Sequence, residues 1–505
     1  MSSSISPSQI SSHEPEYHHE SSSSRRNSKW VIDVKEKLEK MDKSNEVDHW
    51  KKKCIYQIPA CVKDLNKKAY KPQAVSFGPY HHGEEHLNQM EEHKHRALLH
   101  FLKRSNRPIE AYMEALHRVG NHLIDSYDWL DRKWLQHRGE NDEADDDQRN
   151  RYGNYNDQFL QLMMLDGCFM LEILRTATGT TDDYAFNDPI FSYHGKLYIM
   201  PYIRRDMLML QNQLPMLLLD TLLAVETGGA GGGTTTGGKP KNEEFLNRII
   251  SKFCSPNTPI HSLGKCLHVL DVYRKNLLQD PRKKSHQTRP RGPDDHSESS
   301  GDIIRSAMEL HEAGIRFKTS KTMSLKDISF RGGVLRLPVI VVDDTTESTF
   351  LNLMAYERFH VGAGNEVTAY IFFMDNIIDS AKDVSLLHSS GIIQNAVGSD
   401  KAVAKLFNEL SKDVTLDPDS SLDKVHKKVN DYCKKKWNEW RANLIHTYFR
   451  SPWAILSVVA ALFLMALTIA QTIYTIYPYY HPAGSSDSST TPAVTPPRTP
   501  LRPRR

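Results

Sequence analysis

Cysteine is scarce in this sequence, which excludes a fold held together by disulfide bonds. The chain has six cysteines in 505 residues, and no two of them form a C-x-x-C pair. Cys168 lies within the apolar run LMMLDGCFMLEIL, where an isolated cysteine is typically a small core side chain. A reactive nucleophile at Cys168 is the less favoured alternative.

The sequence also lacks the marks of a secreted protein. Residues 1–20 contain no apolar segment of the kind found in signal peptides. No N-x-[ST] glycosylation acceptor occurs in the chain, although Asn257-Thr258-Pro259 comes close to one. A large secreted ectodomain usually carries at least one such acceptor. We therefore expect the main body of the chain to face the cytosol.

Neither an excess of one charge nor a catalytic signature is present. The chain carries 65 basic and 62 acidic residues, a balance that creates no overall field to attract nucleic acid. The patterns G-x-S-x-G, H-E-x-x-H and paired C-x-x-C do not occur. We expect no nucleic-acid partner, no metal and no cofactor.

One long hydrophobic run lies near the C-terminus, at 453–477. Its first part, WAILSVVAALFLMALTIA, contains no charged residue. A helix of this length, at about 1.5 Å per residue, spans the ~30 Å hydrocarbon core of a bilayer. Aromatic residues mark both ends, and Pro478 is expected to stop the helix. The residues expected to contact the lipid bilayer are Trp453, Leu456, Leu462, Phe463, Leu467, Tyr474 and Tyr477.

Positive charge is concentrated just before this run. The basic residues expected to lie next to the membrane are Lys434, Lys435, Lys436, Arg441 and Arg450. On the other side of the run, residues 478–497 contain no Lys or Arg. By the positive-inside rule, we expect a single-pass membrane protein with a cytosolic body and a short tail on the far side. The plasma membrane is one candidate location, and the arginines at 498–505 oppose this orientation. The basic residues either bind anionic headgroups or only set the topology.

Composition divides the chain into four segments. They are a disordered tail at 1–29, a helical body at 30–449, the transmembrane helix at 453–477 and a short disordered tail at 478–505. Low-complexity insertions interrupt the body near 140–150, 228–241 and 282–302. We predict a mainly α (α+β) fold, with a large helical body and a small β-hairpin or sheet.

Apolar residues recur at helical spacing along the body. A docking helix is predicted at 30–41, and further helices at 85–103, 159–174, 207–225, 243–253, 266–278, 347–358, 367–380 and 401–410. The helix in AMELHEAGIRFK is expected to end at Gly314. The clearest strand signal is LKDISFRGGVLRLPVIVVDD, in which Gly332 and Gly333 separate two β-rich runs as in a hairpin.

Residues 233–240, GTTTGGKP, match the G-x-x-x-x-G-K part of a P-loop. Pro240 occupies the position where a P-loop has its magnesium-binding Ser or Thr. The preceding residues are predicted to form a helix, whereas a P-loop follows a strand. A flexible Gly/Thr linker therefore explains the match better than a nucleotide site.

Four polar residues are the candidates for chemistry: His81, His82, Asp343 and Asp344. We interpret the histidines as part of a turn packed under the helix that follows, with metal binding as the alternative. The aspartates follow the apolar run VIVV and are either metal or acid/base carboxylates, or a helix cap. The cap would be Asp344, with Glu347 three residues later.

Several blocks of the sequence occur in an order that is recognisable. They are IYQIP (Ile55–Pro59), AYKPQAVSFGPYHHG (Ala69–Gly83), LNQMEEHK (Leu87–Lys94), DGCFMLEILR (Asp166–Arg175), NQLP (Asn212–Pro215), AMELHEAGIRFK (Ala307–Lys318) and VIVVDDTTES, before the hydrophobic run. Together, over about 30–480, they resemble the plant-specific family called domain of unknown function 247, an uncharacterised protein family. One departure is Gln211, where the family usually has Glu.

The resemblance implies a single-pass membrane protein without an established enzymatic activity. It also singles out Glu91 and Lys94, which are three residues apart and are expected to pair on a helix surface. Some members of the family have been linked to reproductive recognition in plants, including pollen self-incompatibility. Our leading hypothesis is a non-enzymatic interaction, recognition or signalling protein with an unidentified protein partner. The alternative is a membrane-tethered enzyme with an unrecognised active site.

Overall fold

The computed structural model describes the chain in separate stretches. They are residues 30–32, 34–36, 38–39, 47, 50–135, 155–181, 183–228, 241–256, 259, 262–279, 305–412, 422–438, 440–441 and 452–480. They form two compact units, of which the first covers 1–308 with 316–430 and the second 309–315 with 431–505. The predicted N-terminal tail, most of the predicted C-terminal tail, the P-loop-like residues 233–240 and most of the three insertions lie outside the described residues.

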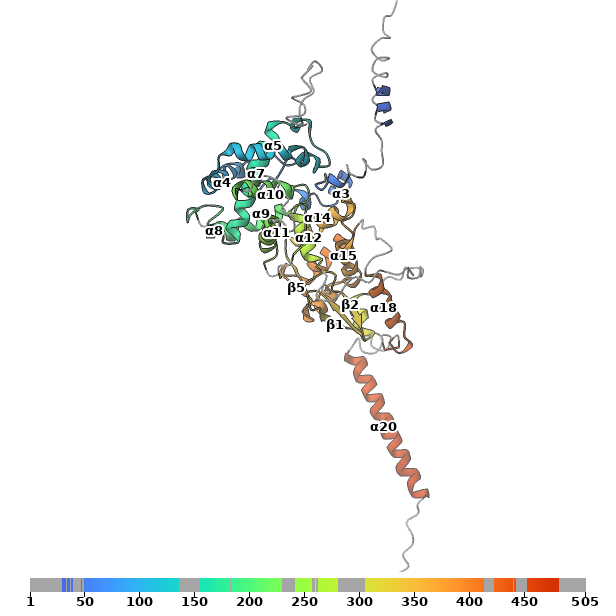
Figure 1. Cartoon of the computed structure of the whole chain (residues 1–505). Helices are drawn as coiled ribbons and strands as arrows, with labels where there is room; N and C mark the ends of the chain where they lie inside the picture. Colours follow the sequence, from blue (N-terminus) through green and yellow to red (C-terminus); the bar gives the residue numbers. More distant parts are fainter. Residues whose placement is uncertain are drawn as a thin grey trace, which may run out of the picture. The chain divides into compact units, whose positions relative to one another are not determined.

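The centre of the first unit is helix α7 (Asp157–Ala177), which is buried along almost its whole length. An unbroken run of buried residues from Leu162 to Thr176 explains why this part of the helix has no polar face. It packs against α4 (Gln89–Ser105), α5 (Ile109–Asp125), α10 (Met216–Glu226) and α11 (Lys241–Cys254) (Figure 1). Cys168 is fully buried on α7, so the prediction of a core cysteine is confirmed.

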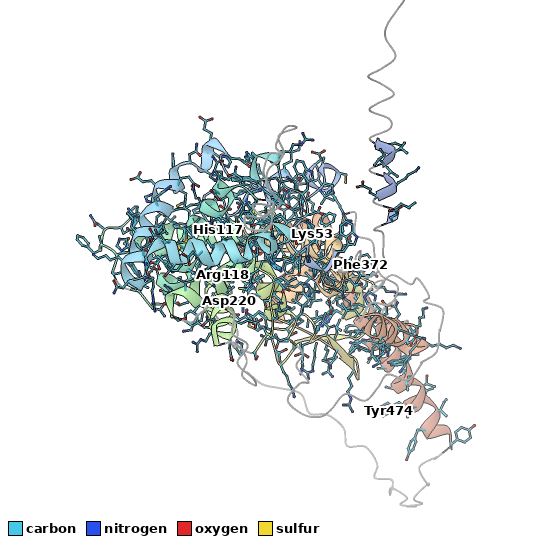
Figure 2. All side chains as sticks on the ribbon, turned by 45° about the horizontal axis from the view of Figure 1, so that its top comes forward. Lys53, His117, Arg118, Asp220, Phe372 and Tyr474 are labelled. Atoms are coloured by element: carbon cyan, nitrogen blue, oxygen red, sulfur yellow. The ribbon has the colours of Figure 1, made fainter. Side chains whose placement is uncertain are left out.

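Shorter elements also occur between residues 60 and 207. They are α3 (Ala60–Lys63), η1 (Lys67–Tyr70), η2 (Glu85–Leu87), η3 (Arg132–Trp134), α8 (Tyr193–Tyr198) and α9 (Met200–Met207). Figure 2 shows α5, marked by His117 and Arg118, beside Asp220 of the neighbouring helix α10. Residues 30–32, 34–36 and 38–39 are helical, with exposed Trp30, Val34 and Leu38.

The rest of the first unit combines helices with two small sheets. The helices are α12 (Val269–Leu277), α14 (Thr346–Phe359), α15 (Glu366–Ile377), α16 (Ala381–Ser389) and α17 (Asp400–Leu410). In one sheet, β3 (Val334–Leu337) pairs antiparallel with β2 (Ser329–Arg331) and parallel with β1 (Arg316–Thr319). In the other, β4 (Ile340–Val342) pairs parallel with β5 (Ile393–Asn395). The predicted mainly α (α+β) fold and the hairpin at Gly332 and Gly333 are both confirmed.

The second unit contains the long helix α20 (Pro452–Tyr480), and parts of α13 (Ala307–Glu312) and α18 (Asp423–Cys433). Within α20, Leu456–Tyr477 has a mean hydropathy of 2.2, and none of it is buried inside the protein. By length and composition this helix could cross a membrane. The expectation that Pro478 stops it is wrong, because the helix continues to Tyr480.

The predicted helix at 207–225 is wrong in its first half. The structure instead ends α9 at Met207 and starts α10 at Met216, with Pro215 as its N-cap. Between them, the side chains of Asn212 and Gln213 donate hydrogen bonds to main-chain carbonyls and hold an irregular loop. Hydrophobicity alone did not reveal this loop, because Leu208, Met209 and Leu210 are buried within it.

Candidate functional site

The two candidate histidines lie in the predicted turn, which is present between Gly78 (φ 74°) and Gly83 (φ 87°). His81 is buried, and its Nδ1 lies 2.6 Å from Glu84 Oε1. Burial lowers the pKa of His81, and Glu84 counteracts part of that effect. The ring of His82 meets Trp134 edge-on at 5.6 Å. In the described part of the chain, no cluster of three or more His, Cys, Asp or Glu could hold a metal ion.

The two candidate aspartates lie just before α14, and the residue predicted to cap this helix is one position off. Asp343 Oδ1 accepts hydrogen bonds from Thr345 N at 2.9 Å and from Thr346 Oγ1 at 2.9 Å. Asp344 is exposed, and the N-cap residue of α14 is Thr345. The hydrogen bonds of Asp343 therefore remain local, while those of His81 remain with Glu84, so the four candidates do not form one site.

Four of the five basic residues predicted to lie next to the membrane, just N-terminal to α20, are among the described residues; Arg450 is not. Lys435 lies over the ring of Tyr432 at 5.6 Å, and Lys434 and Lys436 are exposed. The guanidinium of Arg441 closely approaches Gly314, where an added Cβ would meet Nη1 at 2.9 Å. Trp437 and Trp440 are exposed, with ring centroids 5.3 Å apart. This segment combines exposed cations with exposed aromatic rings.

A cavity of about 690 Å³ lies in the first unit beside α14. Its wall includes Val62, Leu65, Asn66 and Tyr70, the α14 residues Glu347, Leu351, Met354, Ala355, Glu357 and Arg358, then His360, Val361, Gly362, Gly364, Asn365, Thr368, Glu409, Leu410 and Lys412. None of the four candidate residues belongs to it. Its volume is typical of a pocket for a small organic ligand.

Two polar groups of this cavity, Glu357 and His360, are held by neighbouring residues. Glu357 accepts hydrogen bonds from Arg274 Nη2 at 2.7 Å and from the amide of Thr368 at 2.9 Å. The Nδ1 of His360 lies 3.0 Å from the hydroxyl of Tyr56, and burial lowers the pKa of His360. Glu357 is therefore already engaged by residues of the fold, and His360 lies against a tyrosine hydroxyl.

A second polar group lies deep in the first unit, around Lys94 of α4. Lys94 is completely buried, and its Nζ lies 2.7 Å from both Glu91 Oε1 and Asp166 Oδ1. Asp166 also accepts a hydrogen bond from Gly78 N at 2.8 Å. Burial raises the pKa of Asp166, and Lys94 counteracts part of that rise. Glu91 and Lys94 do pair as expected, but the expected surface position is wrong, because Asp166 on the facing helix α7 draws Lys94 inside.

Asp206 and Asn212 extend this buried polar group to the main chain of residues 73–77. We call Lys94, Asp166, Asp206 and Asn212, with their partners, the buried framework. Asp206 Oδ2 accepts hydrogen bonds from three consecutive amides, with the shortest from Ala74 N at 2.6 Å. Asn212 Oδ1 accepts from Phe77 N at 2.7 Å. Burial raises the pKa of Asp206 to about 6, although the three amides counteract part of that effect. These side chains fix the main chain in place of a regular element.

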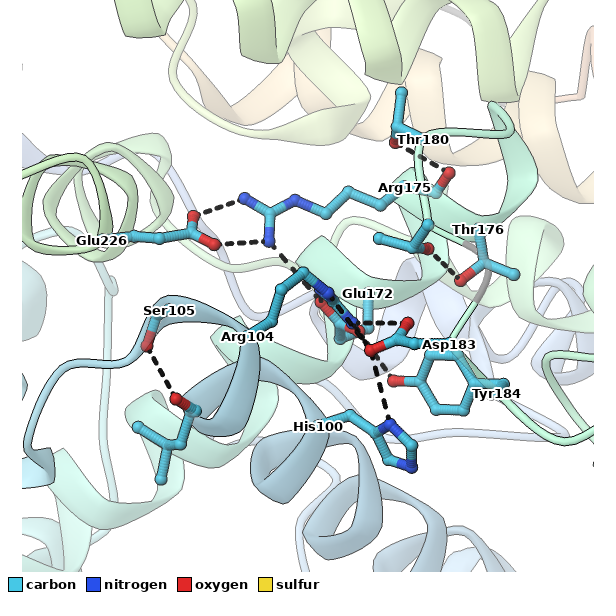
Figure 3. Close-up of polar contacts among 12 residues, drawn as sticks. His100, Arg104, Ser105, Glu172, Arg175, Thr176, Thr180, Asp183, Tyr184 and Glu226 are labelled. Carbon is cyan, nitrogen blue, oxygen red and sulfur yellow. Dashed lines mark hydrogen bonds and ion pairs between the residues drawn. The ribbon is translucent and has the colours of Figure 1, made fainter.

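A third cluster connects α4 to α7 through arginine (Figure 3). Arg104 makes a bidentate pair with the fully buried Glu172, at 2.7 and 2.8 Å, and also contacts Asp183 at 2.8 Å. Arg175 pairs with Glu226 of α10. Planar guanidinium forks of this kind are the strongest ion pairs in proteins. They hold three helices together and leave the cluster's carboxylates Glu172 and Glu226 occupied.

Comparison with known proteins identifies the family. A family model described as "Plant protein of unknown function", DUF247, matches residues 55–467. The chain belongs to the DUF247 family. A UPF0481 protein of Arabidopsis thaliana is 32% identical over 465 residues, covering 87% of this chain and 90% of that protein. A putative UPF0481 protein of the same organism is 34% identical over 176 residues, 34% of this chain and 33% of that one. No solved structure matches the chain significantly.

Several of the sequence blocks that resemble DUF247 proteins contribute residues to the buried framework. Asp166 begins the block DGCFMLEILR, and Asn212 and Gln213 begin NQLP. Gln211, the departure from the family pattern, is buried, and its Oε1 has no hydrogen-bond partner among the residues that the structure describes. Sequence reasoning missed the roles of Asp166 and Asp206, although a carboxylate in an apolar helix such as LMMLDGCFMLEIL signals a buried partner.

A substitution at Gly78 tests the close packing of the buried framework. Its φ of 74° suits glycine, and an added Cβ would lie 2.8 Å from the hydroxyl of Tyr127 and 3.0 Å from the carbonyl of Gln213. We expect Gly78→Ala to lower the free energy of unfolding by about 2–4 kcal/mol, from left-handed strain plus overpacking. Urea denaturation measures the change. Gly83→Ala is the control, because nothing lies within 4 Å of its added Cβ, and an equal loss in both variants would contradict the packing argument.

Proposed function

We propose that this chain is a membrane-tethered, non-enzymatic interaction protein with a recognition or signalling role. The observation that carries the proposal is α20, a strongly apolar helix whose segment Leu456–Tyr477 is not buried inside the described protein. A helix of this kind is stable when it is surrounded by other protein or by lipid. Within the described structure no protein surrounds Leu456–Tyr477, which supports a bilayer as its environment.

In the proposed topology the folded body faces the cytosol and the residues after α20 lie across the membrane. The cations Lys434, Lys435, Lys436 and Arg441 precede the helix, and such residues are retained on the cytosolic side. The exposed rings of Trp437 and Trp440 suit the boundary between lipid headgroups and water. The plasma membrane remains the candidate location.

The non-enzymatic part of the proposal is supported by how the polar residues are used. Asp166, Asp206 and Glu172 are fully buried and bind main-chain amides or cations of the fold. An acid/base catalyst needs a group that can reach a substrate proton. The cavity beside α14 is the observation that favours the alternative, a membrane-tethered enzyme, because His360 and Glu347 lie in its wall.

Two arginine substitutions in α20 test the anchor. We expect Leu462→Arg with Leu467→Arg to move the full chain from the alkali-resistant membrane fraction to the soluble fraction. Each arginine near the centre of a membrane helix costs about 3 kcal/mol. The matched control is Leu99→Arg on α4, which changes an exposed leucine of the body and should leave the chain in the membrane fraction. A wild-type chain extracted by alkali would contradict the anchor.

A further inference from the structure

Helices α8 and α9 carry an unusual outward surface. Four large side chains on them are exposed: Tyr193 by 82%, Leu197 by 53%, Tyr198 by 56% and Tyr202 by 55%. We call these four residues the aromatic face. Single exposed apolar residues are ordinary on proteins, but a contiguous group of them marks an interaction site.

The two helices hold these residues in rows. Ile199 N bonds to the carbonyl of Gly195, and Ile203 N bonds to that of Ile199, so helical spacing continues from α8 into α9. Tyr193 and Leu197 are therefore four residues apart on one row, and Tyr198 and Tyr202 on the adjacent row.

The opposite side of α8 and α9 is anchored in the core. Met200, Ile203 and Met207 are buried, and a Cβ added to Gly195 would collide with the carbonyl of Ile190. The aromatic face is thus presented by a fixed support. A rigid row of tyrosines gives a large contact area with little loss of side-chain entropy on binding.

The segment that carries the aromatic face has a positive net charge. Residues 189–205 contain no Asp or Glu, and Lys196 is exposed. The nearest carboxylates in the chain, Asp188 and Asp206, are buried and engaged with Arg96 and with the amides of 73–75. Arg205 donates a hydrogen bond to the carbonyl of Lys68, whose side chain is exposed.

We propose that the aromatic face docks a partner protein segment with an apolar or aromatic centre and carboxylates at its edge. Tyrosine is enriched at protein interfaces and at their energetic hot spots. A second copy of this chain is disfavoured as the partner. If two aromatic faces packed against each other, the lysines at 196 of the two copies would bring like charges together. A lipid surface is also disfavoured. Helices that lie on a membrane surface have an aliphatic face toward the lipid and a basic face toward the solvent. In α8 and α9 the face opposite the aromatic face is instead buried in the protein core.

This inference rests on the proposed interaction function and gives its partner a chemistry. The test uses the full chain in phosphatidylcholine nanodiscs and a displayed library of short random peptides. We expect the selected peptides to combine aromatic or aliphatic residues with Asp or Glu. Tyr198→Ser with Tyr202→Ser should weaken their binding by about tenfold or more, as for hot-spot residues. Lys196→Glu should weaken it several-fold and flatten its salt dependence.

The matched control is Trp129→Ser, which removes another exposed aromatic residue of the same unit and should leave the affinity unchanged. Equal circular dichroism and melting of the variants ensure that binding, not folding, is compared. Selected peptides without acidic residues, or an affinity unaffected by the tyrosine pair, would overturn the proposal. It would also be overturned if the nanodiscs bound phosphatidylserine vesicles through the same tyrosines. Neither result affects the alkali-extraction test of α20, so the two proposals fail separately.

Discussion

Replacing Lys94 with methionine is expected to lower the free energy of unfolding by about 3–5 kcal/mol. The ammonium group is completely buried and lies 2.7 Å from Asp166 Oδ1. Its removal leaves the carboxylate of Asp166 buried beside one amide donor among the described residues, that of Gly78. Urea denaturation of the full chain in detergent, followed by tryptophan fluorescence, measures the loss.

Two comparisons isolate the charge pair from the loss of a side chain. Lys103→Met removes an exposed lysine from the same helix α4 and should change stability by less than about 0.5 kcal/mol. Adding Asp166→Asn to Lys94→Met should recover part of the loss, because the amide keeps an acceptor for Gly78 N without a charge. If Lys94→Met costs no more than Lys103→Met, the pair does not stabilise the bundle.

Acid is expected to destabilise the fold through His268, the N-cap of α12. Its Nδ1 accepts a hydrogen bond from Asp271 N at 3.2 Å, and its Nε2 lies 3.1 Å from the carbonyl of Cys54. Both contacts require a neutral ring with the proton on Nε2. Burial lowers the pKa of His268 to about 4, against 6.5 for an ordinary histidine, although Asp271 counteracts part of the shift.

The sign of the effect follows from these two pKa values. The unfolded chain binds the proton first, so the stabilisation by neutral His268 is complete above pH 6.5 and is lost as the pH falls through 4. The loss amounts to about 3 kcal/mol.

The variant His268→Asn, whose side chain can still cap α12, should reduce the pH dependence of stability by this amount. The control His194→Asn, at an exposed position, should not. Because Asp206, with its raised pKa, acts in the opposite direction, the comparison is made between variants. Equal pH dependence in all three proteins would refute the role of His268.

The sequence indicated the regular parts of the fold well. Helix α7 was found because apolar residues recur along it at helical spacing, and the β2–β3 hairpin because two glycines separate two strand-like runs. Helix α20 was found because it is both long and free of charge. Strand β1 was missed, because RFKT follows a helix and has one buried residue, Phe317. Its partner β3 lies beyond the intervening hairpin strand, and sequence periodicity cannot reveal such a pairing.

The candidate sites were harder to predict, because they depend on contacts between distant residues. His81 and Asp343 were chosen for their chemical type, yet each is bound locally by Glu84 or by the threonines of α14. The cavity beside α14 is assembled from residues as far apart as Val62 and Lys412. The aromatic face, by contrast, was visible in SYHGKLYIMPYIRR as a tyrosine-rich segment without carboxylates, a signal that was not used.

The most direct measurement of the central claim is glycosylation mapping, since the natural sequence has no N-x-[ST] acceptor. Ser488→Asn creates one in the segment after α20, and Glu143→Thr completes one on Asn141 in the body. Each full-length variant is expressed in plant cells and tested for a glycosidase-sensitive shift in mobility. The proposed topology predicts modification of the Ser488→Asn variant and none of the Glu143→Thr variant. Modification of the body, or of neither variant, would contradict a cytosolic body anchored by α20 in a membrane of the secretory pathway.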